Sequence, residues 1–299
     1  MRQFISPLLL GLFLTSCRMP SEVEKTKPEP PRSAILLSES NIELAKHQSW
    51  TKGPGTYTNV VHGLQNALSE KGLTVDALTE DDLAHDKLRH YRALFIVETF
   101  SITREAEEAI RRYVQSGGTL VGINEVGRYQ SEWTKPWHYE DVFGVESLKT
   151  DEYGTGLSEA PDLYVRANMT PEGSRHPLTS GLGEPLDFGP ANAAIWVSKP
   201  TTATVLAQFP AYKALSQDEA KREHFVQEPA VALSINDFGK GKAVWISANI
   251  HARDSSNWTR APAVLELLTR CPDLAPADLG IPPRPAQTIL GISQLGYAP

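Results

Sequence analysis

Several polar side chains that could do chemistry come directly after short apolar runs of the sequence. They are carboxylates, amides and basic groups: Glu39, Glu98, Asn124, Glu125, Asn249, His251, Arg253 and Asp254. If each apolar run is a parallel strand, these side chains meet at one sheet edge, where open α/β proteins bind ligands. Carboxylates beside a histidine could hold a metal ion or act as an acid and base pair. The candidate catalytic groups are therefore Glu98, Glu125 and His251.

The same residues also have a structural explanation. Polar groups must reach water where strands end, and carboxylates there can cap helices or pair with Arg128 and Arg253. Histidines elsewhere show no metal-ligand spacing, and these are His47, His62, His85 and His90. We therefore expect surface histidines, no metal site and no cofactor, while the catalytic interpretation of the sheet edge stays open.

Four of the six tryptophans fall in loops after the same strand ends: Trp50, Trp133, Trp137 and Trp258. Flat indole faces suit sugar rings, and they suit protein interfaces equally. Together with the polar groups they predict a ligand-binding rim made of Glu39, Trp50, Asn124, Trp133, Trp137, Asp254 and Trp258. The alternative is that these indoles are lids packed over the end of the sheet.

The stretch from Leu73 to Gly127 contains a complete strand-helix-strand unit that would position this rim. Residues 93–97 and 119–123 are continuously apolar, as strands buried on both faces are. Between them, apolar residues recur every three or four positions from Ala106 to Val114, which indicates an amphipathic helix. A right-handed crossover of this kind makes the two strands parallel neighbours.

Further elements extend the unit on both sides. Before it we expect a strand at 33–38, a polar loop through Gly55, a helix at 60–72 and a strand at 73–78. After it we expect strands at 195–197, 203–209, 230–235 and 242–248, a hairpin turn at 237–241 and a closing helix at 262–268. The sequence thus predicts a flavodoxin-like α/β fold: an open, mainly parallel sheet with helices on both faces and extra antiparallel strands in the C-terminal half.

Five segments in order carry a family resemblance: GLTVDALTEDDL, YRALFIVETFSITREAEEAIRRYVQSGGTLVGINEVG, YEDVFGV, HPLTSGL and GKGKAVWIS. They resemble the class I glutamine amidotransferase-like superfamily, most closely the non-catalytic β-galactosidase trimerisation domain of glycoside hydrolase family 42. In active amidotransferases a nucleophilic cysteine follows the strand that here is 119–123. This sequence has Asn124 and Glu125 there, and Cys271 lies elsewhere, so glutamine hydrolysis through a thiolate is excluded.

The N-terminus reads as a targeting segment. Arg2 precedes an apolar stretch at 4–13, and Leu14, Thr15 and Ser16 lead to Cys17. This resembles the lipobox of bacterial lipoproteins, which implies a signal peptide at 1–16 and a lipidated Cys17 carrying acyl chains such as palmitate. Such chains would anchor the protein to a membrane. An ordinary secretory signal is the alternative.

Other features of the chain complete the expected organisation. A polar, proline-rich tether at 17–32 would lead into an amidotransferase-like domain at 33–271. The tail at 272–299 ends in TILGISQLGYAP, which resembles the start of the Ig-like module that precedes the catalytic domain of family 9 cellulases; the alternative is a loose strand. By the lipoprotein sorting rule, Arg18 favours the outer membrane if the organism has one.

Charge and composition bound the partners. A net charge of −7 and a pI near 5.7 argue against nucleic acid, and 40% hydrophobic residues suffice for a core. We expect a lipid-anchored cell-envelope protein whose non-catalytic domain serves binding or assembly, with a glycan, a glycosidase partner or a second copy of itself. The alternatives are a glycan-acting hydrolase using the candidate catalytic groups and a purely structural lipoprotein.

Overall fold

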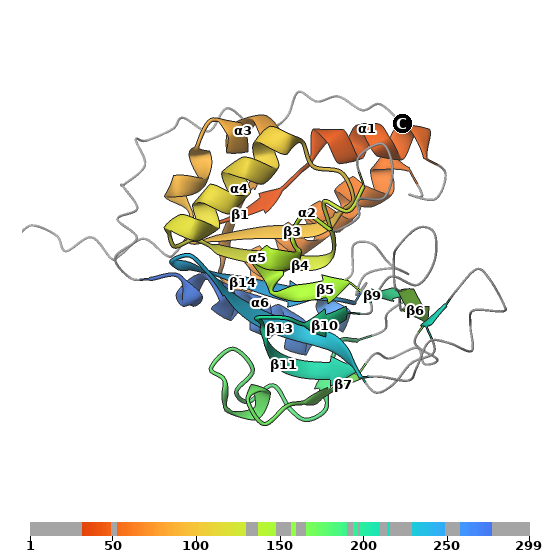
Figure 1. Cartoon of the computed structure of the whole chain (residues 1–299). Coiled ribbons are helices and arrows are strands. Elements are labelled where there is room, and N and C mark those ends of the chain that lie inside the picture. Colours follow the sequence, from red (N-terminus) through yellow and green to blue (C-terminus); the bar gives the residue numbers. More distant parts are fainter. Residues whose placement is uncertain are drawn as a thin grey trace, which may run out of the picture.

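The computed structural model describes residues 32–48, 53–129, 137–147, 157–159, 166–189, 194–196, 198–209, 214–215, 229–248 and 258–276. Its centre is a nine-stranded sheet with the strand order β2-β1-β3-β4-β14-β13-β11-β7-β8 (Figure 1). In that order the strands are Thr74–Leu78, Arg32–Leu36, Ala93–Thr99, Thr119–Val126, Gly241–Ile246, Ala230–Phe238, Thr204–Phe209, Arg166–Met169 and Leu186–Asp187.

Strand direction changes once the sheet passes β14. The strands β2, β1, β3, β4 and β14 are parallel to their neighbours, whereas β13, β11, β7 and β8 pair antiparallel. The predicted fold class is therefore confirmed, including the extra antiparallel strands of the C-terminal half. Two small sheets join β5 (Val145–Ser147) with β10 (Ser198–Pro200), and β12 (Ala214–Leu215) with β6 (Leu157–Glu159) and β9 (Ala194–Trp196).

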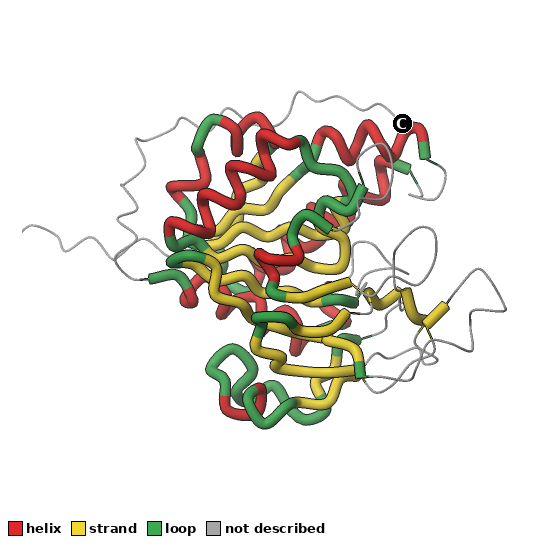
Figure 2. Tube along the Cα trace, in the orientation of Figure 1, coloured by secondary structure: helices red, strands yellow, loops and turns green. Residues whose placement is uncertain are grey.

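Helices cover both faces of the central sheet, as the red segments of Figure 2 show. They are α1 (Glu39–His47), α2 (Pro54–Glu70), α3 (Glu80–Ala84), α4 (Arg104–Ser116), α5 (Glu140–Phe143) and α6 (Pro262–Arg270). One apolar cluster joins α2 and α6 to the sheet, and a second joins α3, α4 and α5 to the opposite face. Among the described residues, no helix is both long and apolar enough to cross a membrane.

Helix α4 shows how local sequence sets one of these layers. Its apolar residues Ala106, Ile110 and Val114 are fully buried against the sheet, as their spacing predicts. Gly117 ends the helix at a φ of 126°, which a residue with a Cβ rarely adopts. A Cβ at the next residue, Gly118, would lie 2.1 Å from the Tyr113 ring, so the turn into β4 depends on two glycines.

The prediction of a polar loop after the first strand was wrong, because α1 occupies most of it. Ser38 caps this helix by accepting a hydrogen bond from the backbone N–H of Asn41 at 2.9 Å. Asn41 itself is buried, although it is polar, because its side chain bonds to the loop after β3. A helix that buries a hydrogen-bonded amide shows little apolar periodicity. Since the prediction relied on apolar periodicity, it missed this helix.

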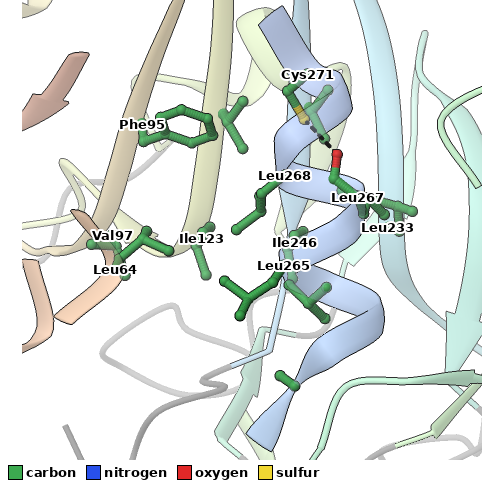
Figure 3. Packing of buried hydrophobic residues seen from close by; sticks show 14 of the residues in the cluster. Leu64, Phe95, Val97, Ile123, Leu233, Ile246, Leu265, Leu267, Leu268 and Cys271 are labelled. Atoms are coloured by element: carbon green, nitrogen blue, oxygen red, sulfur yellow. Dashed lines mark hydrogen bonds between the residues drawn. The ribbon is translucent and has the colours of Figure 1, made fainter. Parts of the chain in front are cut away.

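The α2/α6 face is a continuous apolar layer. Figure 3 shows Leu265 and Leu268 of α6 near Ile123 and Ile246 of the sheet. Cys271 lies at the end of this helix, where its Sγ donates to the carbonyl of Leu267 at 3.5 Å. Burial raises the pKa of the Cys271 thiol, which opposes thiolate formation.

The predicted domain limits stay predictions. The signal peptide at 1–16 with Cys17, nearly all of the tether at 17–32 and most of the tail at 272–299 lie outside the described residues.

Candidate functional site

The predicted rim residue Asn124 and the candidate catalytic residues Glu98 and Glu125 lie at the carboxyl ends of β3 and β4. Val97 pairs with Ile123, and Thr99 pairs with Val126, so Glu98 alone lies opposite Asn124 and Glu125. This two-against-one arrangement is a β-bulge, which redirects side chains and is common beside functional sites. The structure thus brings Glu98, Asn124 and Glu125 together on neighbouring strands.

The backbone at this bulge is unusual. Glu98 has a φ of 43° and Asn124 a φ of 60°, in the left-handed region that favours glycine. Asparagine tolerates this region better than most residues, whereas glutamate does not. Left-handed backbone at two adjacent strand ends costs free energy, and the surrounding packing must maintain it.

The Asn124 side chain is 2% exposed. Its Oδ1 has no hydrogen-bond partner among the residues that the structure describes. The indole N–H of Trp245, on the neighbouring strand β14, lies 3.5 Å from the backbone carbonyl of Asn124. A buried amide oxygen without a partner is uncommon, and it makes Asn124 a notable polar group of this edge.

Glu125 lies beside a buried cation. Its Oε2 is 3.7 Å from Nε of Arg128, and the two residues are each 3% exposed. Burial lowers the pKa of Arg128 to about 10, while the charges of Glu125 and Glu140 act in the opposite direction. Arg128 therefore remains a cation at neutral pH, and the pairing with Glu125 matches the structural alternative proposed for this carboxylate.

Two of the predicted rim tryptophans are packing residues. Trp137 is 4% exposed and Trp258 1% exposed. The Trp137 indole N–H donates to the carbonyl of Val126 at 2.6 Å, and that of Trp258 donates to the carbonyl of Val60 at 3.3 Å. The expectation that these two indoles offer an open face to a ligand is therefore corrected, because burying a large ring with a satisfied N–H is favourable.

The remaining predicted residues divide into two groups. Glu39 is exposed as the first residue of α1, after the carboxyl end of β1. Outside the described residues lie Trp50, Trp133, Asn249, His251, Arg253 and Asp254. Within the described ranges, no group of three or more metal-binding side chains could hold an ion.

The crossing point between β1 and β3, where flavodoxin-like sheets commonly bind ligands, is filled by the protein's own hydrogen bonds. Ser38 Oγ donates to the carbonyl of Ser101 at 2.8 Å. Asn41 Oδ1 accepts from the backbone N–H of Phe100 at 2.9 Å and of Ser101 at 3.2 Å. Tyr57 Oη accepts from the Ser38 N–H at 2.9 Å. The candidate site therefore lies one strand further, at β3 and β4.

Sequence reasoning missed two pairs that fix the chain beyond β4. Glu107 of α4 lies 3.2 Å from Nδ1 of His138, and burial raises the pKa of the Glu107 carboxyl although His138 opposes the shift. Arg111 forms two bonds to Asp141, at 2.9 and 2.7 Å. These contacts hold the segment Trp137–Phe143 on α4. Because the partners are about thirty positions apart, no local pattern could reveal them.

The sheet order and its helices define an α/β protein of amidotransferase-like architecture. Residues 44–257 match the family described as ThuA: Trehalose utilisation. This match covers more than half of the 299 residues, so the chain belongs to the ThuA family. Among curated proteins, none matches the chain.

Solved structures with the same fold include β-galactosidases. The enzyme from Rahnella sp. R3 has 19% identity and a TM-score of 0.54, covering 82% of this chain and 31% of its own. The GH42 β-galactosidase Gan42B from G. stearothermophilus has 20% identity and a TM-score of 0.51, covering 83% and 31%. This chain thus spans about a third of either enzyme. The predicted resemblance to family 42 glycosidases is confirmed for the fold.

A third structure is similar over nearly its whole length. It is a putative thua-like protein from Bacteroides uniformis ATCC 8492, with 12% identity, a TM-score of 0.51, and coverage of 83% of this chain and 96% of that one. At such identity the likeness concerns the fold alone.

Proposed function

We propose that this chain binds carbohydrate without turning it over, and that a lipid on Cys17 holds it at the cell envelope. The observation that carries the binding proposal is Asn124, which stands at the bend where active amidotransferases place their cysteine. A carboxamide is not a nucleophile at neutral pH, so covalent catalysis at this position has no attacking group.

The assignment of carbohydrate as the ligand rests on similarity to other proteins, so it is part of the proposal. The family description refers to trehalose utilisation, and structures with this fold include β-galactosidases. Fold alone does not define function, so the ligand must be argued from the site. Either a free glycan or the sugar-bearing partner of a glycosidase assembly would fit such a role.

Hydrolysis is the competing function. The surroundings of Glu125 argue against a mechanism in which this carboxylate is the general acid. A general acid must give up and regain a proton during each turnover. The Glu125 carboxylate instead lies 3.7 Å from Nε of the buried cation Arg128, so it is already engaged in an ion pair. Glu98, at the bulge, would have to act with a residue outside the described part of the chain, such as His251.

The test combines a binding and a turnover measurement on the full chain in detergent. Trehalose, lactose, maltose and cellobiose are titrated by calorimetry, and the same samples are analysed for released monosaccharide by chromatography. We expect saturable binding of at least one disaccharide and no release. Release that Glu98→Gln, Glu125→Gln or His251→Ala abolishes while the variant keeps its fold by circular dichroism would establish a hydrolase. No affinity for these sugars or for any glycan on an array would leave a structural lipoprotein.

A further inference from the structure

The bulge at the end of β4 sets the direction of one side chain. Asn124 and Glu125 both lie opposite Glu98, so the regular alternation of side chains between the two sheet faces is broken there. The φ of 60° at Asn124 is needed for this break, because a regular strand would continue the alternation. The bulge therefore gives Asn124 an unfavourable backbone conformation.

The oxygen of this carboxamide gains no hydrogen bond in return from the residues that the structure describes. This atom, Oδ1, is buried. Most buried polar atoms are paired, and an exception calls for a ligand, water or ion to complete it. In contrast, the buried amide of Asn41 is used by two backbone N–H groups.

The charges around Asn124 restrict what could complete it. Glu98 lies opposite Asn124 across the bulge and Glu125 follows it on β4; Arg128 offsets the charge of Glu125, so the carboxyl group of Glu98 disfavours an anion. Within the described ranges, the cation beside Glu125 is Arg128, which faces that carboxylate and lies over the Trp137 ring at 3.8 Å. A neutral group that both donates to Oδ1 and accepts from Nδ2 suits this environment, and a hydroxyl does both.

We propose that Asn124 is the hydrogen-bonding anchor of the carbohydrate site and that it binds hydroxyl groups of a neutral sugar, not a sugar phosphate or sugar acid. This inference rests on the proposed function, because it takes carbohydrate binding as given. Beyond the proposed function, it names Asn124 as the residue that binds the sugar and predicts that the sugar is uncharged.

The burial of Asn124 means that sugar binding there should be detectable by tryptophan fluorescence. Since Asn124 is 2% exposed, a ligand must displace the groups that now cover it. The Trp245 indole lies near the Asn124 carbonyl, and its ring is 5.4 Å from that of Trp137. Sugar binding at Asn124 should therefore change tryptophan fluorescence along with the heat of binding.

Glycine is the informative substitution at this position. Asn124→Gly removes the carboxamide but suits a φ of 60°, so the fold should keep its melting temperature. We expect at least tenfold weaker binding of whichever neutral disaccharide the parent chain binds. Asn124→Asp keeps the shape but replaces the N–H donors by a negative charge, and it should weaken binding similarly. The control is Asn168→Ala on β7, which removes an exposed amide.

The outcomes test three separate claims: the role of Asn124, the charge of the sugar, and carbohydrate binding itself. Unchanged affinity in folded Asn124→Gly protein overturns the anchor and leaves carbohydrate binding intact. Tighter binding of trehalose 6-phosphate than of trehalose overturns the neutral class. If the parent chain binds none of the sugars, the proposed function fails and the inference fails with it. Loss of binding in both Asn124 variants, with binding kept in Asn168→Ala, supports it.

Discussion

The guanidinium of Arg128 lies 3.8 Å from the centre of the Trp137 ring, and both side chains are buried. Stacking on an indole compensates part of the hydration that the cation gives up. Glu125, at 3.7 Å, supplies the opposite charge. Glu125 belongs to the bulge and Arg128 follows β4, so the edge that carries Asn124 includes a buried charge pair.

Removing the carboxylate of this pair should destabilise the fold strongly. Glu125→Gln leaves the buried guanidinium of Arg128 without its counter-charge, and broken buried pairs typically cost about 3–5 kcal/mol. Urea titration of parent and variant measures the difference in free energy of unfolding. Glu146→Gln is the matched control, because the ion pair of Glu146 with Lys199 is half exposed and should contribute about 1 kcal/mol or less. Equal effects of the two variants would contradict the role assigned to Glu125.

Glu107 should make stability depend on pH with a defined sign. Burial raises its pKa above 4.5, so the folded state binds a proton more readily than the unfolded state. Its contribution to stability is therefore lost as pH rises from 4.5 through the raised pKa. Glu107→Gln should flatten this part of the stability curve relative to the parent chain, whereas the exposed neighbour Glu105→Gln should not. A parent curve and a Glu107→Gln curve that run parallel between pH 4 and 7 would be the opposite result.

Gly122 should resist even a methyl group. A Cβ there would lie 2.5 Å from Cζ of Phe143, in the aromatic layer that also contains Trp137. Gly122→Ala should cost about 1–3 kcal/mol, since this layer cannot shift without disturbing its stacking. Gly55→Ala in α2 meets open space and should be neutral or slightly stabilising. Thermal melts of the two variants give the comparison, and a fully stable Gly122→Ala protein would show that the layer is looser than described.

Lipidation should depend on a single cysteine. In cells fed an alkyne analogue of palmitate, the parent chain and Cys271→Ser should be labelled and sediment with membranes, because Cys271 is buried in the folded domain. Cys17→Ser should lose both the label and the sedimentation. Labelling that persists in Cys17→Ser would replace the proposed anchor by another mode of attachment.

The sequence predicted best where local signals agreed with the fold. The unit from β3 to β4 combines two continuous apolar runs with an amphipathic helix and a glycine end, so its type and order were readable. Helix α1 was missed because its buried faces include Asn41, whose burial depends on hydrogen bonds to a loop 59 positions away.

The candidate site was readable only in part. Strand order alone places Glu98, Asn124 and Glu125 at one edge, and the structure agrees. The bulge that sets Asn124 apart depends on pairing between strands, which no single segment encodes. Burial of Trp137 likewise results from neighbours distant in sequence, such as Trp245 on β14. The position of Trp137 in a loop of the sequence could not distinguish a buried indole from an exposed indole that binds sugar.

A crystal structure of the chain with a neutral disaccharide bound tests the assigned role most directly. We expect an uncleaved glycosidic bond and a sugar hydroxyl within hydrogen-bonding distance of Oδ1 of Asn124, an atom without a partner in the described part of the chain. A cleaved sugar beside Glu98, or an intact sugar bound away from the ends of β3 and β4, would contradict it.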